Sequence, residues 1–73
     1  MKAILITEDN RQMLAARYDS EIEEFEVGLY MIAEFGDDGS FRYQGQLTRE
    51  NLDLNFVQGE VLDNGFFEIK RRV

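Results

Sequence analysis

Cysteine, histidine, tryptophan and proline are all absent from this chain of 73 residues. Without histidine or cysteine, the chain cannot assemble a Ser–His or Cys–His nucleophilic system, and a structural zinc ion would lack its usual ligands. Small secreted domains are usually held together by disulfides, so a chain without cysteine fits a reducing compartment. We therefore predict a cytoplasmic protein that is not an enzyme, with no catalytic residues, no metal site and no cofactor.

Long apolar runs are also missing, and none approaches the roughly 20 residues needed to span a bilayer. Residues 1–6 resemble the start of a signal peptide, but the polar residues 7–9 interrupt them after a few positions. We interpret this stretch as a first strand, in a protein that is neither exported nor bound to a membrane. The length predicts a single domain over residues 1–73, which we expect to be a monomer.

Basic residues are scarce, with 8 against 15 acidic residues and a net charge of -7. None lies between Arg17 and Arg42, whereas Lys70, Arg71 and Arg72 follow one another at the C-terminus. An acidic field repels nucleic acid and attracts basic protein surfaces, although acidity also simply keeps a small protein in solution. The acidic residues between the two arginines are Asp19, Glu21, Glu23, Glu24, Glu26, Glu34, Asp37 and Asp38.

Apolar residues occupy every second position in two stretches that are separated by a Gly/Asp-rich loop at residues 36–40. Because side chains alternate across a strand, each stretch places its apolar residues on one face. The pattern predicts a central β-hairpin with strands over 26–35 and 41–47. The residues of this apolar face are Phe25, Val27, Leu29, Met31, Ala33, Phe35, Phe41, Tyr43, Gly45 and Leu47.

Two threonines mark the expected starts of helices. Thr7 is a suitable N-cap and precedes good helix formers, which predicts a helix over 8–18. Residues 47–51 repeat the arrangement of residues 6–10 and predict a second helix over 49–55. A turn at 63–65 and alternation after it predict a final strand over 66–73, with an extra short strand near residue 60 as an open alternative.

This order of elements predicts an α+β fold. We expect a small antiparallel sheet with both short helices on one face, in a βαββαβ-like arrangement. A ferredoxin-like split βαβ topology is one arrangement that fits.

The second face of the hairpin is mixed in character. Its Tyr30 and Ile32 are either covered by another element or form an exposed contact patch. The acidic residues that precede the hairpin lie beside this face in sequence. We predict a surface that binds a protein partner with a basic surface. Its residues are Asp19, Glu21, Glu23, Glu24, Glu26, Tyr30, Ile32, Lys70, Arg71 and Arg72.

Motifs for ligands and nucleic acid are absent from the sequence. Gly36 and Gly39 flank two aspartates that would repel phosphate, and the loop lacks the spacing of a calcium site. Residues 41–45 carry aromatics at a spacing of two, without the basic, Gly-rich context of an RNA-recognition strand. We therefore expect no direct sequence-specific binding of nucleic acid.

In size, acidity and lack of catalytic residues, the chain resembles the small bacteriophage transcription regulators that bind host RNA polymerase. The resemblance carries no motif, so it assigns no functional residue. It implies a phage-encoded protein of the host cytoplasm that binds a polymerase subunit and inhibits initiation, promotes antitermination, or both. Two alternatives stay open: a DNA mimic that inhibits a nuclease or another DNA-binding protein, and an adaptor or subunit of a cellular complex.

Overall fold

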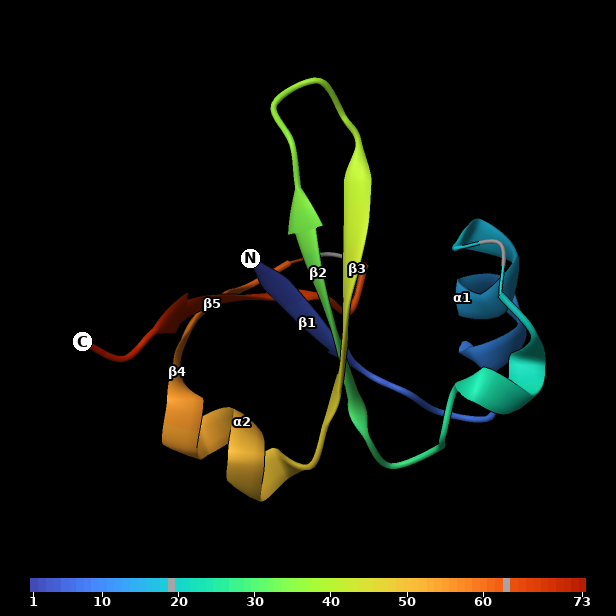
Figure 1. Ribbon diagram of the computed structural model, residues 1–73, viewed down its shortest axis with the longest axis horizontal. Helices are drawn as coiled ribbons and strands as arrows, with labels where there is room; N and C mark the ends of the chain where they lie inside the picture. Colours follow the sequence, from blue (N-terminus) through green and yellow to red (C-terminus); the bar gives the residue numbers. More distant parts are fainter. Residues whose placement is uncertain (19, 63) are drawn as a thin grey trace.

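A computed structural model describes residues 1–18, 20–62 and 64–73 (Figure 1). The described residues form a five-stranded antiparallel sheet and two α-helices, which confirms the predicted α+β class. In chain order the elements are β1 (Lys2–Leu5), α1 (Arg11–Arg17), the 3-10 helix η1 (Ile22–Glu24), β2 (Tyr30–Phe35), β3 (Phe41–Leu47), α2 (Arg49–Asn55), β4 (Phe56–Val61) and β5 (Phe67–Arg71).

The strands lie in the order β3-β2-β1-β5-β4, with β1 at the centre. Ala3 of β1 pairs with Ile32 on one side and with Phe67 on the other. A βαβ unit joins parallel strands, whereas every neighbouring pair described here is antiparallel. The ferredoxin-like topology is therefore wrong, and the extra strand near residue 60 exists as β4.

The helices cover opposite faces of the sheet, not one face as predicted (Figure 1). Leu14 and Ala15 of α1 pack in one core cluster with Ile4 and Met31, the neighbours of Ala3 and Ile32 along β1 and β2. Leu52 of α2 packs in a second cluster with Ala3 and Ile32 themselves. Successive residues of a strand point to opposite faces. Both faces of β1 and β2 are therefore apolar, and each needs its own cover.

The bounds of β3 and α2 were predicted well, but the single apolar face of the hairpin is wrong. The register shifts between Ile32 and Ala33, so Gly45 and Leu47 lie opposite Ile32 and Tyr30 on the α2 side of the sheet.

Strand β3 and helix α2 have the expected bounds, and β2 ends where predicted. Strand β2 begins only at Tyr30, because residues 26–29 form a tight turn in which Gly28 adopts a φ of 97° and the N–H of Leu29 donates to the carbonyl of Glu26. Helix α1 begins at Arg11 and not at residue 8, because Thr7 and Asn10 close a turn ahead of it.

None of the helices within residues 1–18, 20–62 and 64–73 has the length and apolar character to cross a membrane.

Candidate functional site

The predicted acidic residues before the hairpin form one exposed loop, called here the acidic segment (residues 21–26). The side chains of Glu21, Glu23, Glu24 and Glu26 are all exposed, whereas Phe25 is only 1% exposed and anchors the loop in the core. The 3-10 turn of η1 and the buried ring together turn the carboxylates outward. Asp19, the other predicted acid of this region, lies outside the described residues.

Side chains from two other elements hold the backbone of the acidic segment. Gln46 of β3 donates from Nε2 to the carbonyl of Glu24, and its Oε1 accepts from the N–H of Glu26 at 3.1 Å. Arg11 of α1 donates from Nε to the carbonyl of Phe25 at 2.7 Å. Three consecutive residues of the segment are therefore tied to the rest of the fold. Their carboxylates project from a backbone that is already ordered.

Apolar side chains are exposed within and beside the acidic segment. Ile22 is 38% exposed and Val27 is 43% exposed. Tyr43 of β3 is 42% exposed, and its ring centroid lies 5.8 Å from that of Phe25. Sequence reasoning missed Tyr43 and Gln46 as surface residues near the acids. Contacts between residues about twenty positions apart leave no periodic signal in the chain.

The basic side chains mostly contact rings and main-chain carbonyls instead of carboxylates. Four of the cations lie over aromatic rings. The distances to the ring centroids are 4.2 Å for Lys2 over Phe35, 3.8 Å for Arg17 over Phe41, 5.4 Å for Arg49 over Tyr30 and 5.2 Å for Arg71 over Phe56. Within residues 1–18, 20–62 and 64–73, the only ion pair joins Arg49 to Asp53. The carboxylates of the acidic segment thus form no ion pair with any described residue, and Arg11 is bound to the carbonyl of Phe25 and not to a carboxylate.

Tyr30 and Ile32 do not form the predicted exposed contact patch. Ile32 is 4% exposed and belongs to the core cluster beneath α2. Tyr30 is partly buried, with its ring 6.0 Å from that of Phe67 and the Arg49 guanidinium above it. The other predicted possibility, that another element covers these two residues, is confirmed, because α2 with its Arg49 lies on this face. Ile32 is therefore unavailable to a partner.

The basic C-terminal residues do not act as one patch. Arg72 donates from Nε to the carbonyl of Asp53 at 2.7 Å, and its backbone N–H donates to the carbonyl of Asn55. Lys70 is exposed, and Arg71 lies over Phe56. The C-terminal end of β5 and the acidic segment lie at opposite sides of the molecule (Figure 1). The predicted acidic and basic residues therefore belong to separate surfaces.

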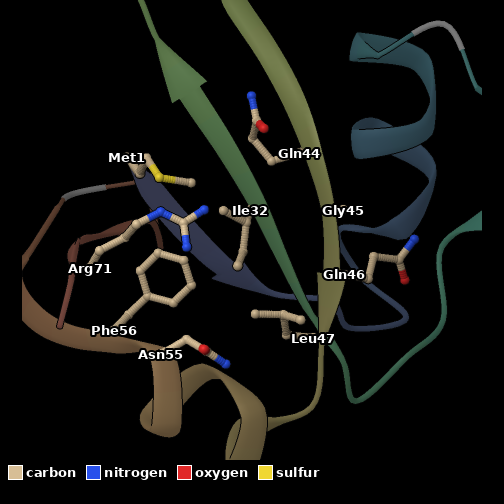
Figure 2. Close-up of a pocket in the computed structure, with 9 residues that line it drawn as sticks. All are labelled: Met1, Ile32, Gln44, Gly45, Gln46, Leu47, Asn55, Phe56 and Arg71. Carbon is tan, nitrogen blue, oxygen red and sulfur yellow. The ribbon is translucent and has the colours of Figure 1, made fainter. Parts of the chain in front are cut away.

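A groove of about 270 Å³ lies on the α2 side of the sheet, between β3 and the end of α2. Figure 2 shows the Arg71 guanidinium above the Phe56 ring and directed toward Ile32, with Leu47 on the same wall. Gln46 points away from these side chains in the same view. The sequence did not predict this groove, because its walls come from both ends of the chain.

No three or more carboxylates come together as a metal site in the part of the chain that the structure describes. No family model, curated protein or solved structure matches this chain. Function is therefore inferred from the geometry and charge of the acidic segment and the groove.

Proposed function

We propose that the protein is a small acidic regulator that acts by binding another protein and not by catalysis. One observation carries the proposal. The carboxylates of Glu21, Glu23, Glu24 and Glu26 are exposed on a backbone held by Gln46 and Arg11, with no described cation paired to them. This arrangement suits a partner that presents a basic surface.

The two kinds of exposed side chain have separate roles in this proposal. The carboxylates attract the basic partner over a distance and raise the rate of encounter. Ile22, Val27 and Tyr43 supply apolar and aromatic contacts, the kind of residue that contributes much of the affinity at interfaces. Because the backbone is already ordered, binding loses less conformational entropy than it would for a free acidic tail.

The partner that we propose is a subunit of a host RNA polymerase, bound by a phage-encoded protein in the host cytoplasm. Binding would alter transcription by inhibiting initiation, by promoting antitermination, or by both. Support for this partner is the resemblance in length, acidity and lack of catalytic residues to the phage regulators of polymerase.

The DNA mimic and the cellular adaptor remain alternatives. A mimic needs carboxylates spaced like phosphates along an elongated face. Here the molecule measures 33 × 30 × 20 Å, and four of the acids cluster in one loop beside apolar side chains. These features favour a compact protein-binding surface over a mimic. They are equally compatible with an adaptor, so the identity of the partner must distinguish an adaptor from a regulator of polymerase.

The decisive experiment reverses the charge of the acidic segment. The triple variant Glu21→Lys, Glu23→Lys and Glu24→Lys should slow association with RNA polymerase about tenfold or more at low salt and weaken its salt dependence. The measurement is the association rate by surface plasmon resonance across a series of NaCl concentrations. Circular dichroism checks that the variant is folded.

A matched control changes the same number of charges elsewhere. Glu50, Glu60 and Glu68 are exposed and lie on α2, β4 and β5, so their joint reversal to Lys should slow association much less. Equal effects of the two triple variants would mean that net charge matters and the acidic segment does not. A pull-down from bacterial lysate that recovers a nuclease in place of polymerase subunits would support the DNA mimic.

A further inference from the structure

The groove beside Arg71 has a polar end and an apolar floor. Ile32 and Phe56 are 4% and 5% exposed and form an apolar floor with Leu47 and Met1, whereas Gln44, Gln46 and Asn55 add polar groups to the lining. Arg71 provides a cation at the margin of this lining (Figure 2). Pockets that bind small molecules typically combine such a lining with a few placed polar groups.

The Arg71 guanidinium lies over an aromatic ring but has no anionic partner among the described residues. Its central carbon lies 5.2 Å from the Phe56 ring centroid, which holds the planar group over an aromatic surface. Among residues 1–18, 20–62 and 64–73, no hydrogen bond or ion pair to this guanidinium is found. A guanidinium presents paired N–H donors that match the two oxygens of a carboxylate. A carboxylate is therefore the anion that complements the Arg71 guanidinium.

The groove stays open because of a glycine in β3. Gly45 pairs with Ile32 of β2, and residues directly opposite in a sheet share a face. A Cβ at Gly45 would meet no atom within 4 Å, so the space above Ile32 at this position is not filled by the protein. The φ of Gly45 is 137°, a conformation that other residues rarely adopt. The backbone conformation therefore favours glycine at the point where a side chain would enter the groove.

We propose that this groove binds a small carboxylic acid with an aromatic or branched aliphatic body. Its carboxylate would pair with the Arg71 guanidinium, and its apolar body would lie against Ile32, Leu47 and Phe56. The volume of about 270 Å³ is below the common range for sites of drug-sized ligands, so the ligand is small. The site is separate from the acidic segment and does not depend on the proposed partner.

Phenylacetate is a suitable probe, with phenylacetamide as its uncharged counterpart. Titration of the labelled protein with phenylacetate, followed by two-dimensional NMR, should give saturable shifts confined to Ile32, Leu47, Phe56 and Arg71. Phenylacetamide should bind at least about tenfold more weakly, because it cannot form the charge-assisted pair with Arg71.

Variants at two neighbouring cations test the role of Arg71. Arg71→Gln should weaken phenylacetate binding about tenfold, and Arg71→Lys should fall between Arg71→Gln and the parent, because lysine keeps the charge but loses the planar fork. Lys70 is exposed and lies outside the groove, so Lys70→Gln should bind as the parent does.

Three results would overturn the proposal. They are an absence of saturable shifts in the parent protein, equal binding of phenylacetamide, and equal losses in Arg71→Gln and Lys70→Gln. The last result would mean that phenylacetate responds only to general positive charge. Because parent binding and the Arg71→Lys variant are measured as well, the proposal is tested even if Arg71→Gln disturbs the fold.

Discussion

The Tyr18 side chain lies among aromatic rings at the edge of the core under α1. Its ring centroid is 5.4 Å from that of Phe41 and 6.1 Å from that of Tyr43. Its hydroxyl is buried and has no hydrogen-bond partner among the described residues. Burial raises the pKa of Tyr18 above its ordinary value of 10.0, against a smaller lowering by the nearby charge of Arg17. A buried hydroxyl without a partner costs stability.

Tyr18→Phe should therefore stabilise the protein by about 1 kcal/mol at neutral pH, because it removes the unsatisfied hydroxyl and keeps the ring. Above pH 10.0 the unfolded chain ionises Tyr18 before the folded chain does, so the parent should lose stability as the pH rises through the raised pKa. Tyr18→Phe should remove this part of the loss. Urea denaturation across the pH range measures both effects.

Tyr43→Phe is the matched control for Tyr18→Phe. The Tyr43 hydroxyl accepts a hydrogen bond from Nε2 of Gln46 at 3.1 Å, and the side chain is 42% exposed. Its removal should be neutral or slightly destabilising at neutral pH. If Tyr18→Phe destabilised the protein more than Tyr43→Phe, the Tyr18 hydroxyl would have to be hydrogen-bonded in solution.

At the scale of elements, the two strand-to-helix junctions use the same contact. Thr7 Oγ1 accepts from the N–H of Asn10 at 3.2 Å, and Thr48 Oγ1 accepts from the N–H of Asn51 at 3.1 Å. At the first junction Asn10 Oδ1 also accepts from the N–H of Thr7, which closes a turn before α1 begins at Arg11. At the second junction Thr48 is itself the N-cap of α2.

The Thr48 contact predicts the effect of two substitutions. Thr48→Ala should lower the free energy of unfolding by about 1 kcal/mol, because it leaves an N–H in the first turn of α2 without its acceptor. Thr48→Ser keeps the hydroxyl and should stay close to the parent. Chemical denaturation measures both variants. Equal losses in the two would attribute the effect to the methyl group of Thr48 and not to the cap.

At the scale of the whole molecule, like charges dominate. The net charge is -7, and one ion pair is found within the described residues. Repulsion among the carboxylates is stronger in the compact state than in the unfolded chain. Salt screens such repulsion between exposed groups, with a Debye length of about 10 Å at 0.1 M.

The free energy of unfolding should therefore increase as NaCl is added at neutral pH, and urea titrations at several salt concentrations measure this. A variant with Glu21→Gln, Glu23→Gln and Glu24→Gln carries less charge, so its stability should depend less on salt. A decrease in parent stability with added salt would mean that attraction involving the basic residues outweighs repulsion among the acids.

Some features of this protein follow from local patterns in the sequence. Alternation over 41–47 predicted the bounds of β3, and Thr48 with the helix formers after it predicted α2 at 49–55. Both features depend on residues that are neighbours in the chain, since a helix cap and the alternation of side chains along a strand are local. The exposure of Glu21, Glu23, Glu24 and Glu26 was likewise expected from their charge. These predictions sufficed for the α+β class and for placing these acidic residues on the surface.

Only the tertiary structure decided what covers each face. Alternation shows that a strand has two faces, but it does not show that α1 covers Met31 while α2 covers Ile32. Strand order, the clamp that Gln46 forms on the acidic segment and the position of Arg71 over Phe56 all join residues far apart in the chain. Such contacts depend on which strands pair and in which register. Pairing and register minimise the energy of the whole fold, so no local stretch of sequence specifies them.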